Sequence, residues 1–266
     1  MNIFDGKKVR DEILEDLEEK IKRLKKKPVL AVVWIGENSV SEHYVKTKLK
    51  IAESIGIKVN LIRLDTNVNR SDVIGGIESL NRDPNITGIM VQLPIPDHLD
   101  QDKIIRTIDP KKDVDGLRYC LGIDSDFMPP VVLAILKAIE VSGRRLDSSD
   151  VSIIGHGFLV GAPLARYLAT RAESLSVADS RTRDLSEISC KGDILISATG
   201  FPGVIKPDML QAGTVLIDAG TAEVSGEIRG DVDPACYEKA SFVTPVPGGI
   251  GPVTIAMLLK NLVDKD

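Results

Sequence analysis

Short apolar runs that end in glycine or proline constrain the fold of this chain most. Residues 29–36 read VLAVVWIG and residues 86–94 read ITGIMVQLP, so neither segment alternates between apolar and polar side chains as a half-solvated strand would. Between them lie another strand candidate, IKVNLIRL at 57–64, and helical patterns around 40–55 and 70–81. This alternation predicts parallel strands that are connected by helices.

A second set of strand and helix patterns begins with VSIIG at residues 151–155. A helical pattern follows from about residue 160, and then come four strand candidates with glycine-rich connections: LSVA, DILISA, TVLIDA and SFVTP. Since 266 residues suffice for two cores, we predict an α/β protein with two lobes around a cleft. Apolar helical segments at 129–143 and 251–263, each with proline near its start, are expected to be buried and to tie the lobes together.

The charge of the chain argues against nucleic acid and anionic membranes as partners. Its formal net charge is −5, and no apolar run approaches the roughly 18 residues that a membrane-spanning helix needs. The basic run KRLKKK at residues 22–27 has two interpretations: a nucleic-acid patch, or cations that complement the macrodipole at the C-terminal end of a helix. The acidic balance of the chain favours the second.

The cysteines indicate a reducing location and no metal site. The sequence has three of them, Cys120, Cys190 and Cys236, an odd number at spacings that match neither a disulfide framework nor a zinc site. We therefore expect a cytoplasmic protein that acts on a small molecule.

A glycine-rich loop, GHGFLVGAP at residues 155–163, follows a strand candidate and opens a helix. Glycines in this context let backbone amides approach a pyrophosphate at a helix N-terminus. The spacing G-x-G-x-x-x-G is one residue longer than the usual dinucleotide motif. A tight strand-to-helix turn without a ligand is therefore the alternative.

The segment VADSRT at residues 177–182 lies where the second strand of a dinucleotide-binding fold should end. Asp179 could accept a hydrogen bond from a ribose 2′-hydroxyl and so favour NAD. Ser180 and Arg181 could instead bind the 2′-phosphate of NADP. These residues alone leave the choice open.

Tyr44 and Lys48 are four residues apart on a predicted helix. Ser39 and Glu42 form a capping-box pattern, so the helix should begin just after Ser39 and end near Gly56. Tyr44 and Lys48 then share a face and are close enough to touch. Such a pair is also common on a solvated helix surface, so spacing alone does not assign a function.

Three further stretches place polar or conformationally special residues where ligands bind. Gln92 ends a buried strand, the position at which open α/β sheets bind ligands, and its amide needs partners such as a lysine. Asp113 and Asp115 lie beside a glycine in KKDVDG, where a solvated turn is the alternative. PVPGGIGPVT at 245–254 is poor in side chains, which lets a flat ligand approach the backbone, although an interlobe hinge would have the same composition.

Taken together, these segments resemble the bifunctional methylenetetrahydrofolate dehydrogenase/methenyltetrahydrofolate cyclohydrolase (FolD) family. In chain order, the matching segments are DGKKV, S-x-x-Y-V-x-x-K, VQLPIP, KKDVDG, G-x-G-x-x-V-G-A-P, SRT, IDAG, GDV and PVPGGIGPVT. They cover nearly the whole chain, so chance is a poor explanation.

The resemblance implies a catalytic folate-binding domain over residues 1–118, rejoined by a C-terminal helix at 252–266, and a Rossmann-type NAD(P)-binding domain over 119–251. It implies oxidation of 5,10-methylenetetrahydrofolate to 5,10-methenyltetrahydrofolate with NADP as hydride acceptor. The methenyl compound is then hydrolysed to 10-formyltetrahydrofolate, in the one-carbon metabolism that serves purine biosynthesis. The resemblance also implies a homodimer.

The same resemblance assigns roles to four residues of the first domain. Lys48 matches the catalytic lysine, and Gln92 matches the residue that hydrogen-bonds and positions it. Tyr44 matches an aromatic residue that packs on the folate and helps orient Lys48. Asp115 matches the carboxylate that binds the amino edge of the pterin, where an acceptor faces two donors.

In the second domain the resemblance assigns cofactor contacts. Phosphates and ribose would be held by Gly155, His156, Gly157, Ser180 and Arg181. Thr221 would lie near the nicotinamide, and Pro247, Gly248 and Gly249 would shape the place where the folate and the nicotinamide meet.

Four departures qualify these assignments. The family usually has serine at Gly157, often arginine at His156 and often histidine at Asp179, so the contacts to a 2′-phosphate are weakened and NAD remains an alternative to NADP. The family's P-C-T-P-x-G reads PPVVLA at 129–134, which loses a threonine and a glycine near the expected cleft.

Two other functions compete with this interpretation. Tyr-x-x-x-Lys is also the signature of short-chain dehydrogenases, but there the pair follows the cofactor loop, whereas here it precedes the loop by more than 100 residues. A cofactor-binding or regulatory protein without catalysis is the other alternative, and Lys48, Gln92 and Asp115 argue against it.

Overall fold

The computed structural model describes residues 1–36 and 39–265, without the side chains of residues 39–44. None of the helices in these ranges combines the length and the apolar content that crossing a bilayer would require.

The described chain divides into two compact units. The three-stranded unit joins Asp11–Pro130 to Ile255–Asp266, and the six-stranded unit joins Met1–Arg10 to Val131–Thr254. The sequence placed the boundary after residue 118 and the first residues in the first lobe. The chain therefore changes unit later than expected, and its N-terminal residues belong with the second sheet.

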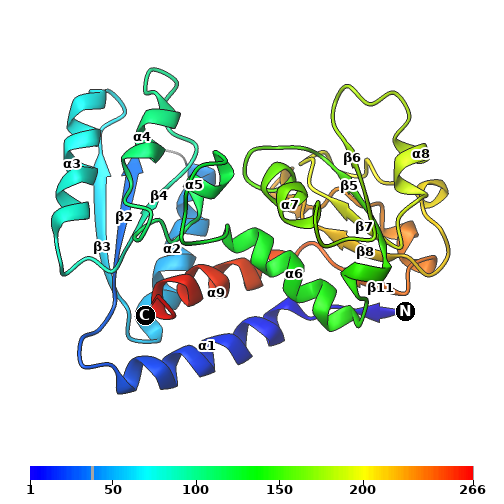
Figure 1. Ribbon diagram of the computed structural model, residues 1–266, viewed down its shortest axis with the longest axis horizontal. Helices are drawn as coiled ribbons and strands as arrows, with labels where there is room; N and C mark the ends of the chain where they lie inside the picture. Colours follow the sequence, from blue (N-terminus) through cyan, green and yellow to red (C-terminus); the bar gives the residue numbers. More distant parts are fainter. Residues whose placement is uncertain (37–38, 266) are drawn as a thin grey trace. The chain divides into compact units, whose positions relative to one another are not determined.

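The three-stranded unit is built on the parallel strands β2 (Val29–Ile35), β3 (Lys58–Leu64) and β4 (Gly88–Val91), in the order β3-β2-β4 (Figure 1). A parallel bridge between Ile89 and Asp113 places part of the segment 108–116 alongside β4. The strands predicted from the apolar runs are confirmed.

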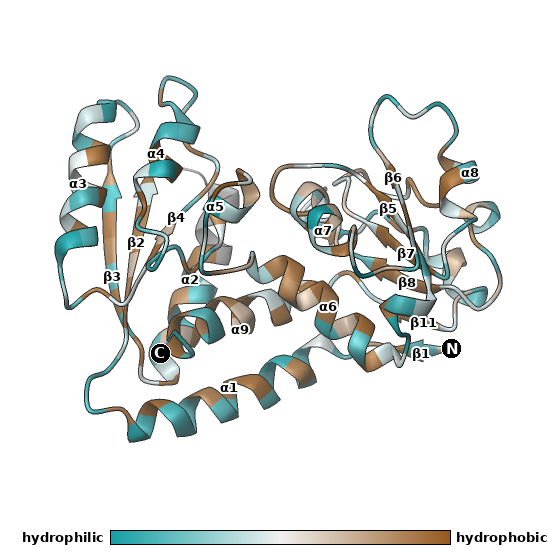
Figure 2. Cartoon of the chain, viewed as in Figure 1, coloured by the Kyte–Doolittle hydropathy of each residue, from teal (hydrophilic) through white to brown (hydrophobic). Residues whose placement is uncertain are grey.

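Helices α1, α2 and α9 contribute to the main core of this unit. The helices of the unit are α1 (Gly6–Arg23, from Asp11 on), α2 (Ser39–Ser54), α3 (Arg70–Arg82), α4 (Gln101–Thr107), α5 (Leu117–Cys120) and α9 (Ile250–Val263, from Ile255 on). Figure 2 shows brown apolar and teal polar residues alternating along α1, as the periodic pattern of its sequence predicts.

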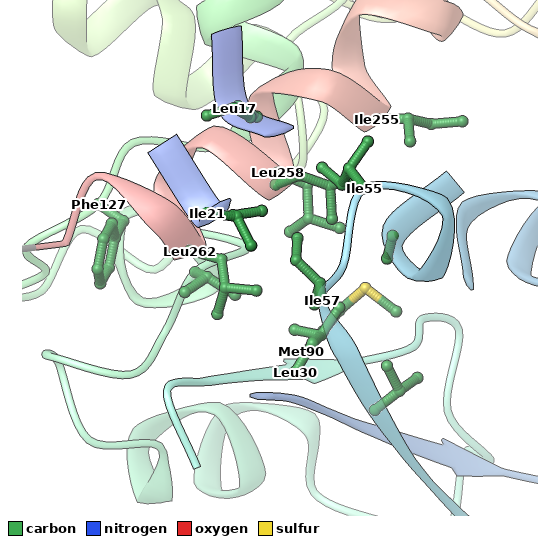
Figure 3. Packing of buried hydrophobic residues seen from close by; sticks show 14 residues of the cluster. Leu17, Ile21, Leu30, Ile55, Ile57, Met90, Phe127, Ile255, Leu258 and Leu262 are labelled. Atoms are coloured by element: carbon green, nitrogen blue, oxygen red, sulfur yellow. The ribbon is translucent and has the colours of Figure 1, made fainter. Parts of the chain in front are cut away.

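The core of this unit lies against one face of β2 and β4. Leu30, Met90 and Ile57 of the strand layer pack there with Leu17 of α1 and Leu258 of α9 (Figure 3). Leu258 and its neighbours come from the last helix, so the C-terminal segment completes the core of the N-terminal domain.

The six-stranded unit contains one parallel sheet in the order β1-β11-β8-β7-β5-β6. Its strands are β1 (Asn2–Ile3), β5 (Asp150–Ile154), β6 (Ser174–Ala178), β7 (Ile194–Ser197), β8 (Val215–Asp218) and β11 (Phe242–Thr244). Its helices are α6 (Pro130–Ser142, from Val131 on), α7 (Gly161–Leu168) and α8 (Leu185–Ser189), and a hairpin joins β9 (Ala222–Val224) to β10 (Glu227–Arg229). The predicted doubly wound sheet is confirmed, and β1 is an addition that the sequence did not reveal.

The strand order identifies the edge at which this sheet binds ligands. From β5 the chain runs to β6 on one side and then to β7 on the other, so the connections diverge between β5 and β7. In open α/β sheets, ligands bind at this switch point, outside the carboxyl ends of the strands. The loops after β5, β6, β7 and β8 are therefore the candidates for a cofactor site.

Candidate active site and cofactor site

Lys48 is a buried lysine on a helix whose neighbouring lysines are exposed. Its side chain is 9% exposed, whereas Lys46 and Lys50 face the solvent. The Lys48 ammonium lies 3.5 Å from the sulfur of Met90, on the core face of β4. A solvated helix surface therefore does not describe the position of Lys48.

Lys48 and Asp115 are coupled electrostatically in a buried setting. Burial lowers the pKa of Lys48, and the Asp115 carboxylate partly offsets this shift. Burial likewise raises the pKa of Asp115, against the stabilising charge of Lys48. Both groups are thus displaced toward their neutral forms, and a lysine whose pKa is lowered gives up its proton more readily.

The KKDVDG turn separates Asp115 from a neighbouring structural carboxylate. Asp113 is fully buried and accepts hydrogen bonds from the backbone N–H groups of Leu117 (3.1 Å) and Arg118 (2.7 Å), at the start of α5. Gly116 has a φ of 65°, and a Cβ there would lie 2.6 Å from the backbone nitrogen of Pro129. Asp113 therefore does not lie in a solvated turn, and of the two carboxylates Asp115 is the one that shifts the pKa of Lys48.

Gln92 directly follows β4, two residues beyond Met90. Its backbone N–H donates to the carbonyl of Val33 (2.9 Å), and its side-chain amide donates to the carbonyl of Leu93 (2.6 Å). The predicted hydrogen bond between Gln92 and Lys48 stays a prediction. The side chain of Tyr44 lies outside the described residues, so its predicted contact with Lys48 also stays a prediction.

Two glycines of the loop after β5 are required by close backbone packing. A Cβ on Gly155, whose φ is 105°, would lie 2.4 Å from the carbonyl oxygen of Ala198 after β7. A Cβ on Gly161 would lie 1.8 Å from the carbonyl oxygen of Gly155. The loop therefore packs tightly at the switch point, while the N-terminus of α7 follows it directly. This geometry fits a dinucleotide pyrophosphate.

The loop after β6 carries an ion pair. The Arg181 guanidinium donates through Nε (3.0 Å) and Nη2 (2.5 Å) to Oδ2 of Asp179, and its backbone N–H donates to Oδ1 (2.9 Å). These bonds lower the pKa of Asp179, and the nearby His156 contributes in the same direction. Ser180 and His156 are exposed at the same edge. A ribose or a 2′-phosphate at this edge would meet Asp179 and Arg181 already paired with each other.

Asp218, a buried aspartate that the sequence left without a role, organises the loop before Thr221. Asp218 accepts hydrogen bonds from the backbone N–H groups of Gly220 (3.0 Å), Asp231 (3.1 Å) and Val232 (3.0 Å). Burial raises its pKa to about 6 although these amides stabilise the charged form. The IDAG and GDV segments are thus joined at the end of β8, and the exposed Thr221 follows this junction.

Gly6 is a further residue that sequence reasoning missed. Its backbone N–H donates to the carbonyl of Gly248 (3.0 Å), and a Cβ on Gly6 would lie 1.9 Å from the carbonyl oxygen of Gly249. Gly249 in turn donates to the carbonyl of Pro245 (2.8 Å). The start of α1 therefore supports the PVPGG loop, in which Pro247 is exposed. The DGKKV segment was the available signal.

Two family descriptions match consecutive parts of the chain. The catalytic domain of tetrahydrofolate dehydrogenase/cyclohydrolase matches residues 4–115, and its NAD(P)-binding domain matches residues 129–266. The chain belongs to the tetrahydrofolate dehydrogenase/cyclohydrolase family. Lys48, Gln92 and Asp115 lie in the catalytic match, and the glycine loop lies in the NAD(P)-binding match.

Relatives of the dehydrogenase/cyclohydrolase family match over almost the whole chain. The bifunctional protein FolD of Hydrogenobaculum sp. (strain Y04AAS1) is 39% identical over 269 residues, covering 98% of this chain and 97% of the relative. The crystal structure of FolD from Campylobacter jejuni superposes with a TM-score of 0.95 at 38% identity, covering 100% of this chain and 98% of that one. The Trypanosoma brucei FolD structure, complexed with NADP cofactor and inhibitor, has a TM-score of 0.91 at 30% identity, covering 99% and 96%.

Within this dehydrogenase/cyclohydrolase, the departures from the family pattern have different structural settings. Gly157 is exposed, and a Cβ added there would meet no described atom within 4 Å, so the family's serine would fit. In PPVVLA, by contrast, Val132 and Ala134 are fully buried in α6. The departure at PPVVLA therefore adds apolar side chains to the core and does not change a polar surface.

Proposed function

We propose that this chain oxidises 5,10-methylenetetrahydrofolate to 5,10-methenyltetrahydrofolate with NADP and then hydrolyses the methenyl compound to 10-formyltetrahydrofolate. The observation that carries the proposal is the buried Lys48 beside Asp115, in the part of the chain that matches the catalytic domain. Folate chemistry is assigned to the domain that contains Lys48, and cofactor binding to the domain that contains the loop at 155–163.

Lys48 carries the proton transfers of the hydrolytic step. Its lowered pKa makes the neutral amine accessible, and a cationic methenyl-folate nearby would lower that pKa further. The neutral amine accepts a proton from the water that attacks the methenyl carbon. It then returns a proton to N5 of the folate as the bond from that carbon to N5 breaks. The remaining hydroxyl proton leaves as the carbonyl forms, so the formyl group stays on N10 and one proton is released overall. Gln92 and Tyr44 are proposed to position the amine.

Asp115 is proposed to bind the pterin ring of the folate. A carboxylate offers two acceptor oxygens to the paired N–H donors at the amino edge of a pterin, so the contact both binds and orients the ring. The charge of Asp115 also moderates the pKa of Lys48, which links substrate binding to proton transfer.

The oxidative step mainly requires the reactants to be positioned. NADP supplies the hydride acceptor. The loop of Gly155, His156 and Gly157 at the start of α7 would hold its phosphates, and Ser180 with Arg181 would hold its 2′-phosphate. Thr221 and the loop of Pro247, Gly248 and Gly249 would shape the place where the methylene carbon meets the nicotinamide. Asp179 keeps NAD as an alternative acceptor.

The proposal also includes a cytoplasmic homodimer. In the described part of the chain, Cys120, Cys190 and Cys236 form no disulfide with one another, which agrees with a reducing compartment. The dimer rests on the family resemblance. Its test is the molar mass in solution, for which about twice the 28.8 kDa of one chain is expected and the mass of a single chain contradicts the dimer.

A spectroscopic assay tests both reactions at once. The protein is supplied with methylenetetrahydrofolate and either NADP or NAD, and the reduced cofactor and the methenyl absorbance are followed separately. We expect both activities, with NADP preferred. Absence of turnover with either cofactor would favour a cofactor-binding protein without catalysis.

Replacing Lys48 tests its assigned role. A Lys48→Met variant keeps most of the apolar stem but has no proton to transfer, so methenyl hydrolysis should fall by at least about 100-fold, while folate still binds. Lys50→Met, a neighbour on the exposed side of α2, is the matched control and should retain activity. Normal hydrolysis in Lys48→Met would remove Lys48 from this role.

A further inference from the structure

Asp179 pairs with Arg181, the arginine that a 2′-phosphate would need as its own partner. Both Nε and Nη2 of Arg181 point to the same oxygen of Asp179, at 3.0 and 2.5 Å. These two donors form one edge of the guanidinium, and an edge of this kind binds phosphate in a bidentate manner. In this structure, that edge is therefore used within the loop.

The pair lies where the ribose of a dinucleotide is recognised. β6 is the second strand of the doubly wound sheet, and Asp179 is the first residue after it. At this position an acid accepts a hydrogen bond from the 2′-hydroxyl of NAD, whereas an arginine nearby accommodates the 2′-phosphate of NADP. This chain has both groups, and they bind each other.

The two cofactors make different demands on the pair. The carboxylate of Asp179 accepts three hydrogen bonds from Arg181. Since a carboxylate has about four acceptor sites, it can accept one more bond from a 2′-hydroxyl while the pair stays intact. A 2′-phosphate must instead draw the guanidinium edge away from Asp179. Since Arg181 is 88% exposed, its side chain has room to turn outward.

We propose that Asp179 is a specificity-determining residue that sequesters Arg181, so that NADP must break the Asp179–Arg181 pair to bind whereas NAD leaves it in place. The proposal rests on the dinucleotide site of the proposed function. Asp179 is then a positioning residue that acts on the 2′-phosphate contact through Arg181. Its pairing with Arg181 reduces the preference for NADP over NAD.

The test measures the dissociation constants of both cofactors by titration calorimetry, which requires no turnover. In Asp179→Asn the amide oxygen still accepts the backbone N–H of Arg181, but the charge that holds the guanidinium is gone. We expect NADP to bind about three- to fivefold more tightly and NAD about threefold more weakly, because its hydroxyl loses a charged acceptor. Asp179→Ser should have the same effects as Asp179→Asn: tighter binding of NADP and weaker binding of NAD. Thermal unfolding checks that each variant is folded.

Asp147→Asn is the matched control. Asp147 pairs with Arg145 at the same two-residue spacing, through Nε (3.0 Å) and Nη2 (2.6 Å). This pair precedes β5 and so lies at the opposite end of the strand from the glycine loop. Its removal should leave both dissociation constants unchanged.

An Arg181→Gln background separates sequestration from simple charge repulsion. If Asp179 acts through Arg181, adding Asp179→Asn there should change NADP binding by less than about twofold. An undiminished gain would show that Asp179 acts by its own charge and would overturn the proposal. A parallel shift of NADP and NAD in Asp179→Asn would also overturn it. Failure of wild-type protein to bind either cofactor would instead contradict the proposed function.

Discussion

Lys48 and Asp115 form an opposed pair of charges in which each partner moderates the effect of burial on the other. The first cause of the lowered pKa of Lys48 is burial, and the Asp115 carboxylate raises it again. Removing that carboxylate in Asp115→Asn should therefore lower the pKa of Lys48 further.

The consequence is a measurable shift in the pH dependence of hydrolysis. The rate follows the neutral amine, so the rising limb of kcat for methenyl hydrolysis should move to lower pH in Asp115→Asn. Asp126→Asn, an exposed carboxylate of the same unit, serves as the control. An unchanged or alkaline-shifted limb in Asp115→Asn would contradict the coupling.

Asp113 should make the stability of the protein depend on pH. Burial raises its pKa from 3.8 to about 7 against two backbone hydrogen bonds. Between these values the folded state holds a proton that the unfolded state releases, so stability should fall as pH rises through this window. Asp218, with a pKa of about 6, adds to the same trend.

Asp113→Asn isolates that contribution, because an amide accepts a backbone hydrogen bond and does not titrate. We expect the drop in Tm between about pH 5 and pH 7.5 to be smaller in this variant than in the wild type. Tm is measured by thermal unfolding in matched buffers. Equal drops in the two proteins would mean that Asp113 does not titrate in this range.

At the scale of elements, the N-terminus of α1 packs directly against the PVPGG loop, so a shift of one displaces the other. The Cβ of a Gly6→Ala variant would lie 1.9 Å from the carbonyl oxygen of Gly249, a backbone atom, so the loop must shift. Dehydrogenase activity should fall by about tenfold or more, because hydride transfer is sensitive to small displacements. Hydrolysis at Lys48 should fall much less.

The ratio of the two activities is the decisive readout for Gly6→Ala. Gly75→Ala in α3 is the control, since a Cβ there meets no described atom within 4 Å and alanine favours helix. It should leave both activities unchanged. A proportional loss of both activities in Gly6→Ala would indicate general destabilisation.

At the scale of the whole molecule, the chain crosses between its two units more than once. α1 and α9 each begin in the six-stranded unit and end in the three-stranded unit. The core around Leu30 and Met90 is therefore complete only when Leu258 and Leu262 of the last helix are in place (Figure 3). Folding of the catalytic domain depends on the end of the sequence.

Leu258→Ala tests this dependence. The side chain is 1% exposed, so its truncation should lower the free energy of unfolding by about 2–5 kcal/mol through lost burial and a cavity. Ile228→Ala removes an apolar side chain that is 52% exposed and should change stability by less than about 0.5 kcal/mol. Denaturant unfolding measures both. A similarly small effect at Leu258 would contradict the role of α9 in this core.

Local sequence determined the elements and the family. Apolar runs predicted the strands of both sheets except β1, since buried strands carry few polar side chains. The glycine loop and the ordered motifs predicted the edge at which a cofactor binds. These signals depend on neighbouring residues or on order along the chain, so one sequence was enough to find them.

Only the tertiary structure decided which of several similar residues matter. Lys46, Lys48 and Lys50 are alike in sequence, and burial against β4 distinguishes Lys48. Asp113 and Asp115 are two residues apart, yet one accepts backbone hydrogen bonds and the other faces Lys48. The support of the PVPGG loop by Gly6 and the pairing of β1 with β11 join opposite ends of the chain. Burial and long-range contact are properties of the folded chain, and local pattern does not encode them.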